Sequence, residues 1–163
     1  MIKYVLKHGV GRSKMYLPSF DKALIEAEVG NYNLVRLSSI LPANSLEVEV
    51  IDITEGSLLP TAYATITSDK SGDHLFSGIM IGFPEDENKV GVIMEYSCND
   101  SNMTSDKLYL ILLNMVQEAF AIRGWKLKNV KWTFADAVVE DEETVTTFAC
   151  VSEWGHGKTE NRY

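Results

Sequence analysis

The sequence has little cysteine and no long hydrophobic run. Cys98 and Cys150 are the only cysteines among 163 residues; two are too few for a disulfide framework, and their apolar, strand-like surroundings predict buried free thiols. No apolar stretch approaches the ~20 residues of a transmembrane helix. Residues 1–10 contain neither the sustained apolar core nor the cleavage site of a signal peptide. We therefore expect a cytoplasmic protein with no membrane partner.

Basic residues and metal ligands are also scarce. The chain has 15 Lys and Arg against 23 Asp and Glu, a net charge of -8, whereas nucleic-acid binding needs a basic face. An acidic protein suits a cationic ligand, although acidity also simply favours solubility. The histidines, His8, His74 and His156, lack the spacing of metal ligands. The sequence therefore predicts neither nucleic-acid binding nor a metal site.

The remaining composition is that of one globular domain. Apolar residues make up 45% of the chain and charged residues 23%, which is typical of soluble proteins. A chain of this length can bury one sizeable core. We expect a single domain over residues 1–154, followed by a loose polar tail over 155–163.

Hydrophobic periodicity predicts two helices among many strands. One helix begins near Pro18 and ends at Gly30, and a longer one covers 104–123 and ends at Gly124. Strands are predicted over 1–6, 32–37, 61–67, 75–83, 89–96, 126–139 and 144–154, with extended chain over 46–53. Residues 8–13 are predicted to form a loop. Helices and strands do not alternate strictly, so we expect an α/β fold of the α+β type with much antiparallel sheet.

One segment combines an apolar strand with two serines and a proline. Residues 30–42 read GNYNLVRLSSILP, in which Ser38 and Ser39 precede Pro42. From spacing alone, a strand that ends in a polar turn explains this pattern.

Several motifs along most of the chain, in the same order and at similar spacing, resemble the pyruvoyl-dependent arginine decarboxylases. They are the Ser-Ser segment, FDxAL at 20–24, GSLLPTAY at 56–63, IMEY at 93–96 and RGW at 123–125. The resemblance implies a four-layer α/β/β/α sandwich with mostly antiparallel sheets. It also implies a homotrimer, sometimes stacked as a hexamer, with active sites between protomers.

The resemblance further implies that the chain is a zymogen that cuts itself between Ser38 and Ser39. The hydroxyl of Ser39 attacks the preceding carbonyl, and β-elimination then leaves fragments 1–38 and 39–163. Ser39 becomes a covalently bound pyruvoyl group, which forms a Schiff base with the substrate amine and takes the place of pyridoxal phosphate. The implied reaction converts L-arginine to agmatine and carbon dioxide in polyamine biosynthesis, without a metal.

Family resemblance also implies roles for individual side chains. Glu95 would return a proton to the α-carbon, although a glutamate at a strand end can simply face water. Asn33 would donate a hydrogen bond during cleavage or to the substrate, although it can be a polar residue on an exposed strand face. Asp21 would bind the guanidinium, although acidic residues favour the first turn of a helix anyway. The substrate-binding positions also include Gly30, Tyr32 and Ile40.

Two departures from the family pattern leave the substrate open. Residues 134–138 occupy a region where the family pattern predicts a Glu-His pair, and Lys22 puts a cation beside Asp21. One alternative is therefore a pyruvoyl decarboxylase for another amino acid. The other is a non-catalytic relative that acts as an assembly or binding module, but the joint presence of Ser39, Glu95 and Asn33 favours an enzyme.

Overall fold

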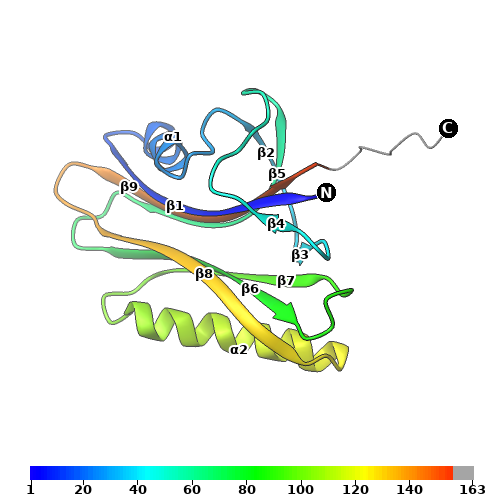
Figure 1. Ribbon diagram of the computed structural model, residues 1–163. Coiled ribbons are helices and arrows are strands. Elements are labelled where there is room, and N and C mark those ends of the chain that lie inside the picture. Colours follow the sequence, from blue (N-terminus) through cyan, green and yellow to red (C-terminus); the bar gives the residue numbers. More distant parts are fainter. Residues whose placement is uncertain (156–163) are drawn as a thin grey trace.

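The computed structural model describes residues 1–155, which form two β-sheets stacked face to face between two helices (Figure 1). This arrangement confirms the expected α/β/β/α sandwich. In chain order the elements are β1 Lys3–Ser13, α1 Tyr16–Glu26, β2 Asn33–Arg36, β3 Ile40–Leu41, β4 Leu46–Glu47, β5 Leu58–Ser68, β6 His74–Pro84, β7 Gly91–Asn99, α2 Ser105–Arg123, β8 Leu127–Val138 and β9 Thr144–Trp154.

The two sheets differ in strand order and in the helix that covers them. The first sheet has the order β2-β5-β9-β1-β4, and the second has the order β3-β7-β6-β8. Most strand pairs are antiparallel, and the pairs β1–β4 and β2–β5 are parallel. Helix α1 packs against β1 and β9, and α2 packs against β6, β7 and β8. Each helix therefore covers the outer face of its own sheet (Figure 1).

Alternating side chains along the strands divide the core into layers. One apolar cluster lies between α1 and the first sheet, another between the two sheets, and a third between the second sheet and α2. Their largest buried members include Phe148 in the first cluster, Ile93 in the second and Phe120 in the third. Each sheet therefore has one face against the other sheet and one face against its helix, and alternate side chains of a strand enter these two layers.

The ends of α2 are those that the sequence predicts. The Thr104 side chain caps the helix by accepting a hydrogen bond of 3.2 Å from the Lys107 amide. Gly124 follows the helix with a φ of 65°, a left-handed conformation that glycine adopts at little cost. These local signals are sufficient because neither depends on a distant segment.

The expected loop over residues 8–13 is wrong, because β1 continues to Ser13. Gly9 and Gly11 lie inside this strand, where α1 packs directly on the backbone. A Cβ atom on Gly11 would overlap the carbonyl oxygen of Ser19, and one on Gly9 would overlap that of Ala23. The two glycines therefore permit close helix–sheet packing rather than a turn.

Two other boundaries also differ from expectation. Helix α1 ends at Glu26, and Glu28, not Gly30, adopts the left-handed conformation, with a φ of 63°. Within residues 46–53, only Leu46–Glu47 forms a strand. The predicted tail lies outside the described residues, apart from Gly155.

Candidate active site

The Ser38–Ser39 peptide lies where the chain crosses from the first sheet to the second. On one side, the Leu37 amide donates to the Thr61 carbonyl of β5 over 3.0 Å. On the other, the Ile93 amide of β7 donates to the Ser39 carbonyl over 2.7 Å. The peptide therefore connects two edge strands of different sheets, β2 and β3, and its flanking residues are bonded to β5 and β7.

The serine pair is accessible without being fully exposed. Ser38 is exposed, and Ser39 and Ile40 are half-buried. Within residues 1–155, the positive φ values occur elsewhere, at Glu28, Asn44, Glu142 and four glycines. The peptide is thus held by the hydrogen bonds of the Leu37 amide and the Ser39 carbonyl on either side of it, without left-handed backbone strain.

Glu95 lies on the same strand as the amide that holds Ser39. It follows Ile93 by two residues, so both side chains extend from the same face of β7, toward the first sheet. The Glu95 side chain is 32% exposed, which is less burial than its apolar neighbourhood predicts. Its Oε2 atom is nevertheless buried and has no hydrogen-bond partner among the described residues. A buried, unpartnered carboxylate oxygen is uncommon and needs an explanation.

Arg36 joins this cluster, although no motif or spacing in the sequence singles it out. Its Nη2 atom donates to Glu95 Oε1 over 2.8 Å and to the Tyr63 carbonyl over 3.2 Å. The guanidinium carbon also lies 4.5 Å from the centre of the Tyr63 ring. The hydrogen bond to Glu95 raises the pKa of Arg36 above its usual value. In the sequence, the one signal of this role is a cation two residues before the serine pair.

Asn33 lies on β2, but its side chain faces the neighbouring turn. Its Nδ2 atom donates to the Gly56 carbonyl over 2.8 Å, and the side chain is exposed. The Asn31 side chain fixes the same turn by donating to Glu55 over 2.8 Å. Asn33 therefore stabilises the approach to the serine pair, and within residues 1–155 its side chain makes no hydrogen bond to Ser39.

The other predicted substrate-binding residues lie outside the first sheet. Asp21 is exposed on α1, on the opposite face of that sheet from Glu95, and its side chain makes no hydrogen bond or ion pair within residues 1–155. Gly30 and Tyr32 line a shallow cavity of about 240 Å³ beside Glu55. One chain therefore brings Ser39, Ile40 and Glu95 together and leaves Asp21 separate.

The two sequence departures are remote from this cluster. The Lys22 ammonium donates to the Arg12 carbonyl over 3.0 Å, so it does not pair with Asp21. Residues 134–138 lie in β8, at the opposite edge of the second sheet from β3. Within that segment Asp136 pairs with His74 over 2.8 Å.

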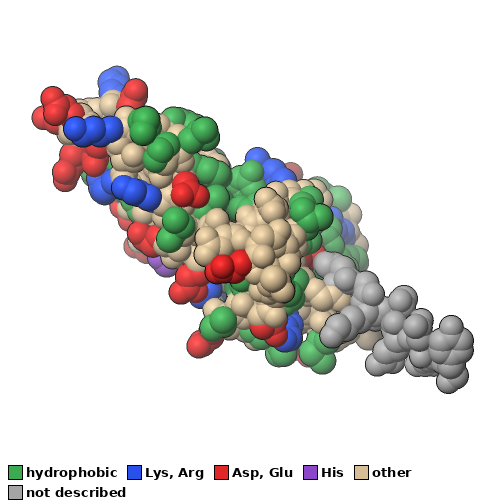
Figure 2. Space-filling model, turned by 90° about the horizontal axis from the view of Figure 1, so that it is seen from above, with side chains coloured by type: hydrophobic (Ala, Val, Ile, Leu, Met, Phe, Trp, Pro, Cys, Tyr) green, Lys and Arg blue, Asp and Glu red, His purple; other side chains and the backbone are tan. Residues whose placement is uncertain are grey.

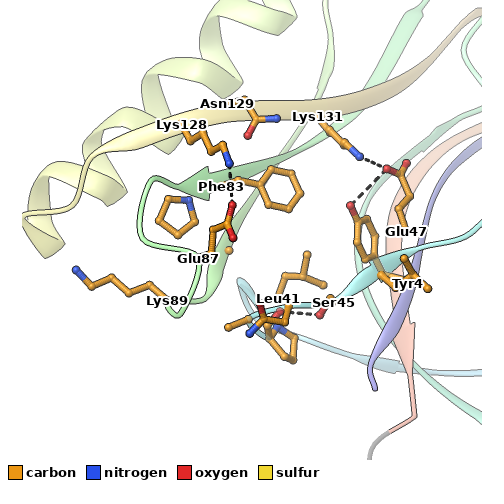
Figure 3. Close-up of a pocket in the computed structure, with 16 residues that line it drawn as sticks. Tyr4, Leu41, Ser45, Glu47, Phe83, Glu87, Lys89, Lys128, Asn129 and Lys131 are labelled. Atoms are coloured by element: carbon orange, nitrogen blue, oxygen red, sulfur yellow. Dashed lines mark hydrogen bonds and ion pairs between the residues drawn. The ribbon is translucent and has the colours of Figure 1, made fainter.

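A larger cavity of about 420 Å³ opens where the two sheets diverge (Figure 3). Phe83 and Tyr4 contribute apolar surface, and Lys131 pairs with Glu47 across the gap. Lys128 pairs with Glu87 over 2.9 Å at the rim. Four of the five charged side chains that line this cavity are thus paired across it, and the fifth, Lys89, pairs with Asp86 outside it.

Two classes of feature are missing from the part of the chain that the structure describes. Residues 1–155 contain no cluster of three or more His, Cys, Asp or Glu side chains that could hold a metal ion. Neither α1 nor α2 is long and apolar enough to cross a membrane.

Comparison with known proteins gives consistent matches over most of the chain. The family model described as pyruvoyl-dependent arginine decarboxylase matches residues 3–157. Proteins named pyruvoyl-dependent arginine decarboxylase from Methanococcus maripaludis (strain C6) and Thermococcus sibiricus are 34% and 37% identical. The first alignment covers 87% of this chain and 81% of the Methanococcus protein. The second covers 91% of this chain and 93% of the Thermococcus protein.

A solved structure of pyruvoyl-dependent histidine decarboxylase at pH 8 also matches, with a TM-score of 0.49 and 15% identity. That match covers 63% of this chain and 52% of the other.

Proposed function

The chain belongs to the pyruvoyl-dependent arginine decarboxylase family, and we propose that it is a self-processing cytoplasmic enzyme that converts L-arginine to agmatine and carbon dioxide. The hydrogen bond between the Ile93 amide and the Ser39 carbonyl carries this proposal. It holds the serine pair against the strand that bears Glu95, so the cleavage site and the acid share one location.

Self-cleavage begins at the Ser39 hydroxyl. Its oxygen attacks the Ser38 carbonyl carbon, the Ser38–Ser39 amide breaks, and an ester forms with the amine of Ser39 released. Loss of the Ser39 α-proton expels the Ser38 carboxylate from the β-carbon and leaves dehydroalanine. Tautomerisation and addition of water then release ammonia and leave a ketone at residue 39. The anchored positions of Leu37 and Ser39 support this route, because they limit the motion of the peptide between them.

The residues around Ser39 fit a pyruvoyl group. When bound, that group supplies a ketone that condenses with an amine and a neighbouring carbonyl that takes up electrons as carbon dioxide leaves. The Ile93 amide would hold that neighbouring carbonyl, which is the present carbonyl of Ser39, and would stabilise negative charge on it. Ile40 follows directly and fixes the strand by pairing with Val92. The proposed chemistry uses neither pyridoxal phosphate nor a metal ion.

Glu95 is the proposed proton donor. Loss of carbon dioxide leaves an electron pair on the α-carbon, which must take up a proton to give the amine product. The buried Oε2 atom of Glu95 has no partner among the described residues, so it is free to hold and deliver that proton. Asn33 is the proposed hydrogen-bond donor during cleavage or to the substrate. The hydrogen bond from its side chain to the Gly56 carbonyl fixes its position on β2.

The position of Asp21 supports an active site between protomers of a trimer or hexamer. In one chain, the first sheet separates Asp21 from Glu95, so an Asp21 that binds the substrate guanidinium would come from a neighbouring copy, together with Gly30 and Tyr32. Figure 2 looks onto the α1 side and shows hydrophobic side chains among charged ones on this face. The exposed apolar residues of α1 and its start, Met15, Tyr16, Leu17 and Ile25, could pack against that copy.

The experiment that tests the proposal combines a mass measurement with a substrate series. The purified protein should give two fragments under denaturing conditions, with the break after residue 38. It should then release carbon dioxide from arginine faster than from lysine, ornithine or histidine. A preference for another amino acid would keep the pyruvoyl chemistry but contradict arginine as the substrate. An intact, inactive chain would favour a binding module.

A further inference from the structure

We propose that Arg36 is the positioning residue for Glu95, and that it leaves Oε2 as the oxygen that delivers the proton. This inference rests on the proposed function, because it assigns a partner to the proposed acid. It comes from the tertiary contacts of Arg36, which joins β2, β5 and β7 at one point.

The guanidinium of Arg36 is itself fixed in place. Its Nη2 atom donates to the Tyr63 carbonyl over 3.2 Å, and the group lies over the Tyr63 ring at 4.5 Å. A planar guanidinium held by a carbonyl and an aromatic face has little freedom to rotate. The 2.8 Å hydrogen bond to Oε1 therefore restrains the orientation of the whole Glu95 carboxyl group.

The same bond distinguishes the two oxygens of Glu95. Oε1 is occupied by Arg36, whereas Oε2 is buried without a partner in the described chain. A polar atom left unpaired in the interior destabilises the fold, so its presence here points to a functional demand. With Oε1 held, Oε2 is the oxygen available to a reacting atom beside Ser39.

A purely stabilising ion pair does not explain this geometry well. The Arg36 and Glu95 side chains are 57% and 32% exposed, and ion pairs that solvent reaches contribute little to stability. Self-cleavage would also put Arg36 on fragment 1–38 and Glu95 on fragment 39–163. Arg36 would thus make the small fragment part of the catalytic machinery after the chain is cut.

Three variants test the inference. Arg36→Met removes the donor, Arg36→Lys retains a cation, and Lys128→Met breaks an exposed pair with Glu87 at the other cavity as a matched control. We expect all three to self-cleave, because Arg36 takes no part in the cleavage chemistry. The methionine variant should lose about 10- to 100-fold in kcat with KM within about 3-fold of the unmodified enzyme. The lysine variant should recover most of that loss, and Lys128→Met should match the unmodified enzyme.

Two further readouts do not depend on turnover rate. In deuterium oxide, the unmodified enzyme should label agmatine in one configuration, whereas Arg36→Met should give a mixture because the acid is no longer oriented. In the uncleaved Ser39→Ala chain, the side-chain carboxyl ¹³C signal of Glu95, assigned with Glu95→Gln, should move on Arg36→Met and stay in place on Lys128→Met.

The inference would be overturned if Arg36→Met had the kcat of the unmodified enzyme and labelled agmatine with deuterium in a single configuration. Failure of that variant to self-cleave would also overturn it, since Arg36 would then act in processing, and so would a lysine variant as impaired as the methionine one. An intact or inactive unmodified protein would instead contradict the proposed function, and the ¹³C experiment would still decide whether Arg36 holds Glu95.

Discussion

The backbone amide of Ile93 donates a 2.7 Å hydrogen bond to the carbonyl of Ser39, and this contact places the serine pair against β7. Both residues belong to the proposed fragment 39–163, so the bond persists after the chain is cut. The bond from Leu37 to Thr61, in contrast, joins the two proposed fragments. The residue that would become the ketone is thus anchored independently of the strand that precedes it.

Ser39→Ala should leave the chain continuous, because alanine has no hydroxyl to attack the Ser38 carbonyl. Ser38→Ala is the matched control: it should still cut, because only its backbone carbonyl reacts and its side chain is exposed. Denaturing mass spectrometry distinguishes the two variants. The fragment masses of the unmodified protein should sum to one ammonia less than simple hydrolysis predicts. A cut Ser39→Ala chain would exclude Ser39 as the nucleophile.

Glu95→Gln should self-cleave normally and decarboxylate slowly. Glutamine can keep a hydrogen bond with Arg36 but has no acidic proton, so we expect a loss of about 100-fold or more in kcat. Carbon dioxide release measures the rate, and the mass spectrum measures the cleaved fraction. Glu87→Gln, at an exposed ion pair, serves as the control. Full activity in the Glu95 variant would remove this residue from its role.

Asp21→Asn and Glu95→Gln should each be impaired alone and should complement one another when co-expressed. If each site takes Asp21 from one protomer and Glu95 from another, about a quarter of the sites in randomly mixed oligomers contain both intact residues. Activity above that of either variant, at subsaturating arginine, is the expected result. Absence of recovery in oligomers that native mass spectrometry shows to be mixed would place both residues on one chain.

Gly11→Ala should destabilise the fold strongly. The added Cβ would overlap the Ser19 carbonyl oxygen, and overpacking of this kind costs about 3 kcal/mol. Gly91→Ala is the control, since its Cβ would meet ordinary contacts at 3.4 Å, and it should cost less than about 1 kcal/mol. Urea unfolding of both variants in the Ser39→Ala background measures the difference. Equal midpoints would contradict the close packing of α1 on β1.

Cys150 should resist thiol reagents until the protein unfolds. Burial raises its pKa from 9.0 to about 12, so at pH 8 almost none of it is in the reactive thiolate form. Burial also raises the pKa of the half-buried Cys98, which should react slowly in the native state. Counting modified thiols with and without urea checks both statements. Rapid labelling of two thiols in native protein would show that β9 is not buried as described.

Local sequence signals predicted most elements because their causes are local. The cap at Thr104 and the left-handed Gly124 fix α2, and alternating or continuous apolar runs identify β5 to β9. The glycines of β1 led to the wrong prediction of a loop over residues 8–13. They are needed because α1 packs closely across the strand, and not because the chain turns there. Glu28 likewise replaced Gly30 at the end of α1, where its side chain pairs with Lys7.

The candidate site was predictable only in part. The serine pair and Glu95 were found through resemblance, since neither has a spacing that singles it out. Arg36 was missed, because its partners Tyr63 and Glu95 are 27 and 59 residues away in the chain. No periodicity predicts a contact between strands of two different sheets.

The sequence by itself determined most of the helices and strands, because hydrophobic period and capping act over a few residues, and it carried the motifs whose resemblance to the family implied the four layers. Tertiary structure alone decided which residues meet Ser39. The chain leaves one sheet at Leu37 and joins the other at Ser39, and only that crossing brings Arg36, Ile93 and Glu95 to the same peptide. Such proximity follows from the stacking of two sheets, a long-range arrangement that no short stretch of sequence specifies.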